Sequence, residues 1–172
     1  MTAIAELKAL YMAENRRRFP SLPEGARACY TYTDKNANGL TRCILDFLRF
    51  KGHQSERISV TGRFIDQSQI VTDVCGFQRR IGSGKYIKTA MQPGTADISA
   101  IIHGKSVKIE VKIGRDRQSP AQRHYQEQVE RAKGIYFIAT SFGQFLEWFN
   151  ELTKTNPGCR KLNPDEIPKC HE

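Results

Sequence analysis

Apolar residues recur with a helical period in four segments of this chain. The spacing i, i+3, i+4, i+7 and i+8 is typical of a helix that buries one face against a core. Gly52 follows the second segment as a stop signal. Ser119 and Ser141 each stand three residues before a glutamine, which is the pattern of a capping box. The four predicted helices cover residues 3–15, 38–51, 119–133 and 142–153.

Strand patterns lie between these helices. Residues 135–140 form an uninterrupted apolar run, typical of a buried strand, and residues 56–66 alternate, which fits a strand or a hairpin around Thr61 and Gly62. From residue 66 to 94 the pattern weakens and glycines interrupt it, so short strands or a mobile loop are expected. The predicted fold class is therefore α/β, with a central mixed β-sheet and helices packed on its faces.

The segment 97–113 separates into two faces if it folds as a hairpin that turns at Gly104 and Lys105. One face is then apolar. The opposite, solvent-facing side carries Asp97, Ser99, Lys108, Glu110 and Lys112. In this register Asp97 lies opposite Lys112, and Glu110 is its diagonal neighbour at about 7–8 Å, a span that two carboxylates can bridge around one cation.

Two carboxylates beside a lysine suit a bound Mg²⁺ ion that polarises a phosphoryl group. Mg²⁺ takes few protein ligands and completes its octahedron with water and substrate oxygens. A neighbouring lysine can orient or deprotonate the attacking water. A surface ladder of ion pairs on a one-sided hairpin explains the same residues, and periodicity alone slightly favours that ladder.

Length and cysteine content bound the class of protein. The 172 residues suffice for one ordinary domain, predicted at residues 36–154, with a peripheral helix and tether at 1–35 and an irregular tail at 155–172. The five cysteines form no paired spacing, and the chain begins with no signal peptide or long apolar run, so a cytoplasmic protein with reduced thiols and no membrane segment is expected. Cys159 and Cys170 have no CxxC partner, so no zinc site is assigned.

The charge balance points to a polyanionic partner, with nucleic acid considered first and an ordinary solvated basic surface as the alternative. Lys and Arg number 27 against 18 Asp and Glu, a net charge of +9. Residues 76–117 hold nine of the basic residues and only three acidic ones. Residues 79–88 have a composition that suits a loop on a phosphate backbone, and a flexible surface loop with incidental charge explains that stretch equally well. The candidate nucleic-acid contacts are Arg57, Arg63, Arg79, Arg80, Lys85, Lys88 and Arg115.

Three short motifs follow one another in the second half of the chain. They are G-x-x-D at residues 94–97, E-x-K at 110–112 and S-x-x-Q at 119–122. In this order they resemble the PD-(D/E)XK nuclease superfamily, closest to its VRR-NUC or Holliday-junction-resolvase-like branch, over about residues 38–150. The resemblance implies a restriction-endonuclease-like α/β fold and a DNA endonuclease that uses Mg²⁺, or Mn²⁺ in its place, on substrates that include branched or repair intermediates.

The resemblance also implies roles for individual residues. Asp97 and Glu110 become metal ligands, the carbonyl of Val111 a third ligand, and Lys112 the base that handles water. Gln122 becomes an active-site contact. Its place in the capping box gives Gln122 a structural reason as well, and the two explanations are compatible.

One position departs from the family pattern. The VRR-NUC pattern has a glutamate near the start of the helix before the strands, where this chain has Asn38, which also suits a helix N-cap. Asp46, farther along that helix, is predicted to face solvent and is a poor substitute. The missing carboxylate argues against a second metal ion and leaves an alternative, a catalytically inactive nucleic-acid-binding module on the same fold. A homodimer is expected if the substrate is branched.

Overall fold

The centre of the molecule is a four-stranded mixed β-sheet. The computed structural model describes residues 2–59, 62–87 and 92–154. In spatial order the strands are β1 (Gln54–Arg57), β6 (Ile98–Ile102), β7 (Lys105–Val111) and β8 (Ile135–Ala139). The pairs β1–β6 and β6–β7 are antiparallel, whereas β7 and β8 run parallel. The predicted α/β class and mixed sheet are confirmed.

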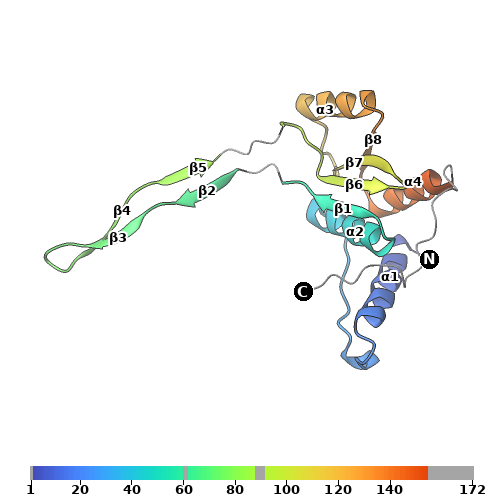
Figure 1. Cartoon of the computed structure of the whole chain (residues 1–172), viewed down its shortest axis with the longest axis horizontal. Coiled ribbons are helices and arrows are strands. Elements are labelled where there is room, and N and C mark those ends of the chain that lie inside the picture. The colour runs from blue at the N-terminus through green and yellow to red at the C-terminus, as the bar shows by residue number, and fades with distance from the viewer. Residues whose placement is uncertain (1, 60–61, 88–91, 155–172) are drawn as a thin grey trace.

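The four predicted helices are present and lie on both sides of this sheet. They are α1 (Ala3–Arg18), α2 (Ala37–Phe50), α3 (Pro120–Arg131) and α4 (Phe142–Lys154), with a short 3-10 turn, η1 (Glu24–Ala26), after α1. Figure 1 shows α3 on one side of the sheet and α1, α2 and α4 on the other. The apolar face of the 97–113 segment packs against α2, and its polar face lies toward α3.

The hydrophobic core fills the space between α2, α4 and the sheet. Its fully buried side chains include Leu40, Cys43, Ile44, Phe47 and Leu48 of α2 and Ile98, Ile102, Val107 and Ile109 of the strands. Leu7 of α1 is also fully buried in this cluster, so the first helix packs into the core and is not peripheral as expected. The reason is that α1 contacts both α2 and α4, which periodicity within α1 cannot show.

Two expectations about α2 are wrong. The N-cap is Asn36, whose Oδ1 accepts the Gly39 N–H at 2.8 Å, whereas Asn38 lies inside the first turn. Asp46 is buried, not solvent-facing, because the Tyr32 hydroxyl donates to its carboxylate at 3.1 Å. The segment that contains Tyr32, just before α2, thus covers the side of α2 that carries Asp46.

Residues 63–87 form a long antiparallel arm that projects from the body (Figure 1). Its strands are β2 (Arg63–Asp66), β3 (Gln69–Thr72), β4 (Gln78–Ile81) and β5 (Gly84–Ile87). The pairs β2–β5 and β3–β4 keep one continuous register. Short strands were one of the two alternatives expected here. The hairpin around Thr61 and Gly62 is wrong, because β1 pairs with β6 and β2 with β5; Thr61 itself lies outside the described residues.

The hairpin β6–β7 is confirmed, but its register differs by two residues from the expected one. The turn is at His103 and Gly104, whose φ angles of 50° and 75° suit a type I′ turn. Ile98 therefore pairs with Ile109, and continuation of the register brings Asp97 level with Glu110, not with Lys112. Because a shift of two preserves side-chain alternation, the apolar and polar faces remain as predicted.

Several expectations concern the remaining parts of the chain. In the ranges that the structure describes, no helix has the length and apolar character needed to cross a membrane. Cys29, Cys43 and Cys75 are free thiols. The predicted irregular tail, with Cys159 and Cys170, lies outside the described residues.

Candidate active site

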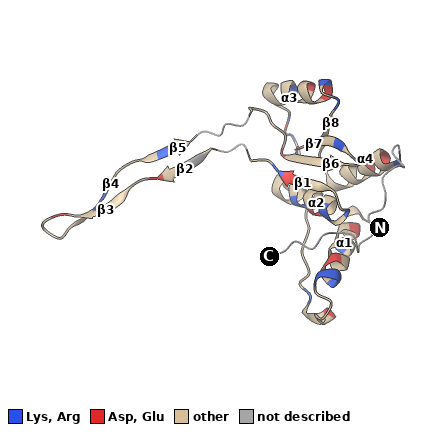
Figure 2. Cartoon of the chain, viewed as in Figure 1, with Lys and Arg blue, Asp and Glu red and all other residues tan. Residues whose placement is uncertain are grey.

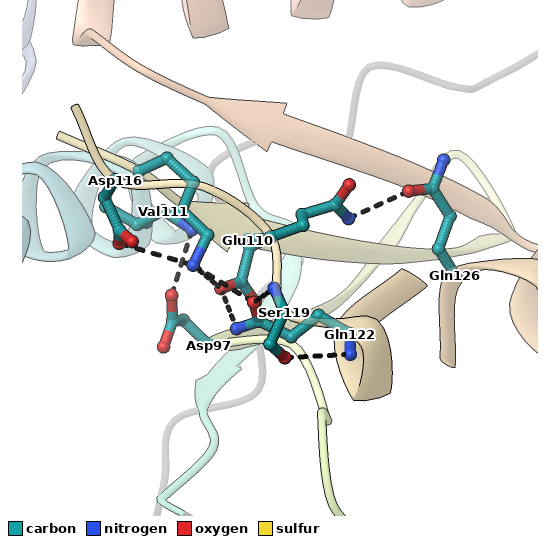
Figure 3. Close-up of polar contacts among 9 residues, drawn as sticks. Asp97, Glu110, Val111, Asp116, Ser119, Gln122 and Gln126 are labelled. Carbon is teal, nitrogen blue, oxygen red and sulfur yellow. Dashed lines mark hydrogen bonds and ion pairs between the residues drawn. The ribbon is translucent and has the colours of Figure 1, made fainter. Parts of the chain in front are cut away.

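Three motif segments meet at the end of β7, as Figure 3 shows. Asp97 precedes β6, Glu110 and Lys112 lie at the end of β7, and Gln122 lies in the first turn of α3. The structure therefore brings together all four residues that the sequence predicts to be catalytic.

Glu110 is the centre of the polar contacts. Its Oε1 accepts a hydrogen bond from Gln122 Nε2 at 2.5 Å and forms an ion pair with Lys112 Nζ at 3.0 Å. The Oδ2 atom of Asp97 accepts the Val111 N–H at 2.9 Å, which fixes the Asp97 carboxylate beside the same strand end. Only 2% of Glu110 and 9% of Lys112 are exposed. The alternative of a surface ladder of ion pairs is therefore wrong for this pair, because α3 shields these groups from water.

The start of α3 confirms the predicted capping box and places the Gln122 side chain against Glu110 and Lys112. Ser119 Oγ accepts the Gln122 N–H at 3.2 Å, and Gln122 Oε1 accepts the Ser119 N–H at 2.9 Å, which completes the capping box. The same Oε1 accepts from Lys112 Nζ at 3.1 Å, while the amide nitrogen donates to Glu110. Gln122 thus couples the helix start to the two charged groups of the site.

Gly94, the first residue of the G-x-x-D motif, allows its loop to lie against the start of α3. Its φ of 82° is in the left-handed region, and a Cβ built there would stand 2.4 Å from the backbone carbonyl carbon of Ala121. Any side chain would therefore push the loop away from α3, and Asp97 lies only three residues farther along. The backbone conformation and this close approach explain the glycine at position 94 without any role in catalysis.

We expect Gly94→Ala to destabilise the fold by more than Gly104→Ala. Both glycines have positive φ, which costs alanine about 1–2 kcal/mol, but nothing lies within 4 Å of a Cβ at Gly104. Gly94→Ala adds the cost of overpacking against α3, about 1–3 kcal/mol. Urea unfolding of the two variants measures the difference. Equal free energies of unfolding would contradict the close approach of the loop.

The charges at the site shift the pKa values of both members of the ion pair. Burial raises the pKa of Glu110, and the nearby Asp97 raises it further; the contact with Lys112 offsets these effects only in part. Burial lowers the pKa of Lys112, but the hydrogen bond and charge of Glu110, together with Asp116, outweigh it, so the pKa lies above its ordinary value. Lys112 is therefore an ammonium group at neutral pH.

Asp116 is a site residue that the sequence analysis did not single out. Its Oδ2 lies 3.3 Å from Lys112 Nζ, so the lysine bridges two carboxylates. The loop after β7 folds back through a hydrogen bond from the Asp116 N–H to the Ile113 carbonyl at 3.1 Å, which brings Asp116 under the lysine. The spacing of four residues from Lys112 is the only signal in the sequence, and outside a helix it predicts no contact.

The donor set fits a hard divalent cation. Glu110 Oε2 is buried and has no hydrogen-bond partner, a state that costs free energy unless a cation or water fills the gap. Asp97 is its register neighbour, and oxygen donors of this kind suit Mg²⁺. No group of three or more His, Cys, Asp and Glu side chains with metal-binding geometry occurs among the described residues, so the chain offers two carboxylates here.

The predicted nucleic-acid contacts are not all close to this site. Arg57 lies at the end of β1, and Arg115 is exposed in the loop between β7 and α3. Arg79 and Arg80 lie on the arm, ion-paired with Asp73 and Asp66. Exposed Lys85 is on β5, Arg63 is placed on β2 by its backbone, and Lys88 lies outside the described residues. Figure 2 shows a basic segment on β5 and an acidic one on β2, so the arm carries both charges.

Comparison with known proteins adds no relative. The sequence matches no model of a protein family, and a search of curated proteins finds no match either. The geometry of the site and the motif resemblance are therefore the observations that point to a function.

Proposed function

We propose that this chain is a metal-dependent endonuclease that hydrolyses phosphodiester bonds in DNA, with a restriction-endonuclease-like fold of the PD-(D/E)XK type and closest to the VRR-NUC branch. One observation carries the proposal. A buried carboxylate, Glu110, keeps one oxygen without a partner beside a second carboxylate, Asp97, while its other oxygen meets the ammonium group of Lys112. Structural support alone gives no reason for such a group, because a buried carboxylate oxygen without a partner costs free energy.

The residues have distinct roles under this proposal. Asp97 and Glu110 hold Mg²⁺, or Mn²⁺ in its place, with the Val111 carbonyl as the predicted third protein donor. When bound, the ion polarises the phosphoryl group and makes water more acidic. Gln122 keeps Glu110 and Lys112 in place through its two hydrogen bonds, and α3 excludes bulk water from their side of the sheet.

The role proposed for Lys112 differs from the base implied by the resemblance. A base must be neutral to accept a proton, and the raised pKa of Lys112 favours the charged form. We therefore assign to its Nζ the task of holding its proton and donating a hydrogen bond to an anionic oxygen of the substrate, which takes the place of the exposed Asp116 carboxylate. Such donors, fixed before the reaction, stabilise charge that develops in the transition state.

DNA is the proposed substrate and partner because of the net charge of +9 and the basic residues around the site. Arg115 and Arg57 are the contacts nearest to the motif segments, whereas the aspartates that pair with Arg79 and Arg80 weaken the arm as a phosphate-binding surface. A homodimer that places two sites on a branched substrate is part of the same proposal.

A binding module without catalysis is the second candidate, and Asn38 favours it. The side chain at this position is neutral, and its Oδ1 accepts a hydrogen bond from Arg57 Nη2 at 2.8 Å. A carboxylate that would strengthen cation binding in the family is therefore replaced by a group that binds an arginine.

A cleavage assay separates the two candidates. Purified protein is incubated with linear, nicked, flap and four-way DNA in Mg²⁺, Mn²⁺ or EDTA, with single-stranded RNA as a further substrate. The endonuclease cuts at least one DNA in Mg²⁺ or Mn²⁺ and none in EDTA. DNA binding without cleavage under every condition would favour the binding module.

We also expect Mg²⁺ to stabilise the folded protein, and more so at neutral than at acidic pH. At ten times its Kd, a ligand adds about 1.4 kcal/mol. The raised pKa of Glu110 means that its proton is lost only above the ordinary value of 4.5, so acidification through this raised range protonates Glu110 and competes with the cation. Thermal unfolding with Mg²⁺ or EDTA across this pH range measures the effect.

The control for this measurement is Glu110→Gln, which removes the charge and keeps the shape. In the variant, the increase in Tm caused by Mg²⁺ should vanish at every pH. An equal increase in the variant and the natural protein would place the cation elsewhere.

A further inference from the structure

A polar pocket lies on the surface of α2, beside β1. Its volume is about 530 Å³, and none of its lining residues takes part in the contacts around Glu110. Its lining residues include Tyr30, Asn38, Arg42, Asp46, Arg49 and Arg57. We call it the arginine pocket.

The arginine pocket carries surplus positive charge. Its three arginines share a single lining carboxylate, that of Asp46, which is itself only 8% exposed. Asp46 lies 3.0 Å from Arg42 and 3.8 Å from Arg49. Arg57 is hydrogen-bonded to a neutral amide instead of a carboxylate. The pocket is thus suited to an anion with several oxygens, because guanidinium groups bind phosphate in a planar, two-pronged manner.

The arginines are held in position and yet remain accessible. The guanidinium of Arg42 lies 4.9 Å from the centre of the Tyr30 ring and donates to Asp46. Asp46 is in turn fixed by the Tyr32 hydroxyl. The side chains of Arg42 and Arg49 are nevertheless 57% and 56% exposed. Groups that are ordered before binding lose less entropy when a ligand arrives.

The pocket and the proposed active site lie at the same end of the ladder between β1 and β6, the pocket toward α2 and the active site toward α3. Arg57 pairs with Ile98 in that ladder, and the next N–H, that of Ile58, donates to the Asp97 carbonyl at 2.8 Å. The end of β1 therefore carries an arginine of the pocket and, by its adjacent residue, holds the loop of Asp97. A DNA backbone that passes around this strand end can therefore meet both the proposed active site and Arg57.

We propose that the arginine pocket binds backbone phosphates of the DNA whose scissile bond lies at Asp97 and Glu110; this inference rests on the proposed function. Arg42, Arg49 and Arg57 contact phosphates that flank the bond, without contacting the reacting atoms. Asn38, where the family pattern has a glutamate, acts here as the residue that positions Arg57.

The test is the salt dependence of DNA binding in EDTA, which prevents cleavage. A labelled DNA duplex is titrated at several salt concentrations with the natural protein and with R49Q/R57Q. Arg42 is left unchanged because it pairs with the buried Asp46. Glutamine removes each charge and keeps a hydrogen-bond donor. Loss of two phosphate contacts should reduce the slope of log K against log salt by about 1.8.

The matched control is K105Q/K154Q, which removes the same charge from positions outside the pocket, at the hairpin turn and the end of α4. Its slope should equal that of the natural protein. Thermal unfolding checks that both double variants are folded. Equal slopes for the two double variants, or no DNA binding by the natural protein, would overturn the inference.

This outcome is distinguishable from failure of the proposed function. If R49Q/R57Q shows the reduced salt dependence but no substrate is cleaved with any metal ion, the proposal for the arginine pocket is supported and the proposed endonuclease activity is rejected. If cleavage occurs and R49Q/R57Q binds and cleaves DNA as K105Q/K154Q does, the proposed endonuclease activity is supported and the role of the arginine pocket is rejected.

Discussion

Asp97→Asn should reduce metal-dependent DNA cleavage at least about a thousandfold while DNA affinity in EDTA stays close to that of the natural protein. The substitution removes one of two anionic donors, and electrostatic stabilisation by a metal ion contributes several kcal/mol to the transition state. A loss of about 4 kcal/mol corresponds to a factor of about one thousand in rate. Single-turnover cleavage measures the rate, and anisotropy measures the affinity.

Asparagine has nearly the same size and shape as aspartate, so a loss of cleavage in this variant reports the loss of the negative charge. Asparagine keeps an oxygen that can accept the Val111 N–H, so the loop should retain its anchor. Asp116→Asn is the matched control, because it removes the same charge from the exposed partner of Lys112 and leaves both proposed metal ligands intact. It should lower the rate less than tenfold, the usual scale of a surface ion pair, about 1 kcal/mol. Cleavage by Asp97→Asn at the natural rate would reject the site.

Local signals predicted the elements that form this site. The serine and glutamine at residues 119 and 122 specify where α3 begins, because both hydrogen bonds of a capping box lie within four residues. The apolar stripe of α2 is buried as its spacing predicts. The division of the β6–β7 hairpin into two faces also holds, since side-chain alternation depends only on parity along the strand.

Long-range contacts explain what sequence patterns did not predict. The hairpin register followed a turn with positive φ at His103, an uncommon conformation for a residue other than glycine. Burial of Glu110 and Lys112 depends on α3, and burial of Asp46 on Tyr32, both from distant parts of the chain. The contact between Asp116 and Lys112 depends on a loop conformation that has no period. The main error of the sequence analysis was to predict that the polar face of the sheet is exposed to solvent, whereas Glu110 and Lys112 on this face are buried.

Lys112→Met should lower the free energy of unfolding by about 3–5 kcal/mol at neutral pH, the usual effect of removing one partner of a buried ion pair. Glu110 would keep its charge in a buried position near Asp97 with only Gln122 as a donor. Methionine has a similar length, so the loss reflects charge more than packing. Urea unfolding measures it.

Lys108→Met is the control, because Lys108 lies on the same strand, and its Nζ donates to the Ser99 hydroxyl at 2.6 Å. Its loss should cost about 1 kcal/mol, as for an ordinary hydrogen bond. The double variant E110Q/K112M should recover most of the stability lost by Lys112→Met, since no buried charge is left unpaired, and it should remain unable to cleave DNA. Recovery of stability without activity would separate the structural and chemical roles of the pair.

The pH dependence of Lys112→Met identifies the group responsible for the loss. The folded-state pKa of Glu110 is raised, because the ionised carboxylate is unfavourable in the fold. The contribution of Glu110 to the free energy of unfolding is therefore greatest below the ordinary pKa of 4.5 and is lost as pH rises through the raised pKa. Without Lys112 this pKa rises further. The stability difference between the natural protein and Lys112→Met should therefore shrink as pH falls and Glu110 takes up a proton. A difference that stays constant with pH would mean that lost packing, and not the uncompensated carboxylate, destabilises the variant.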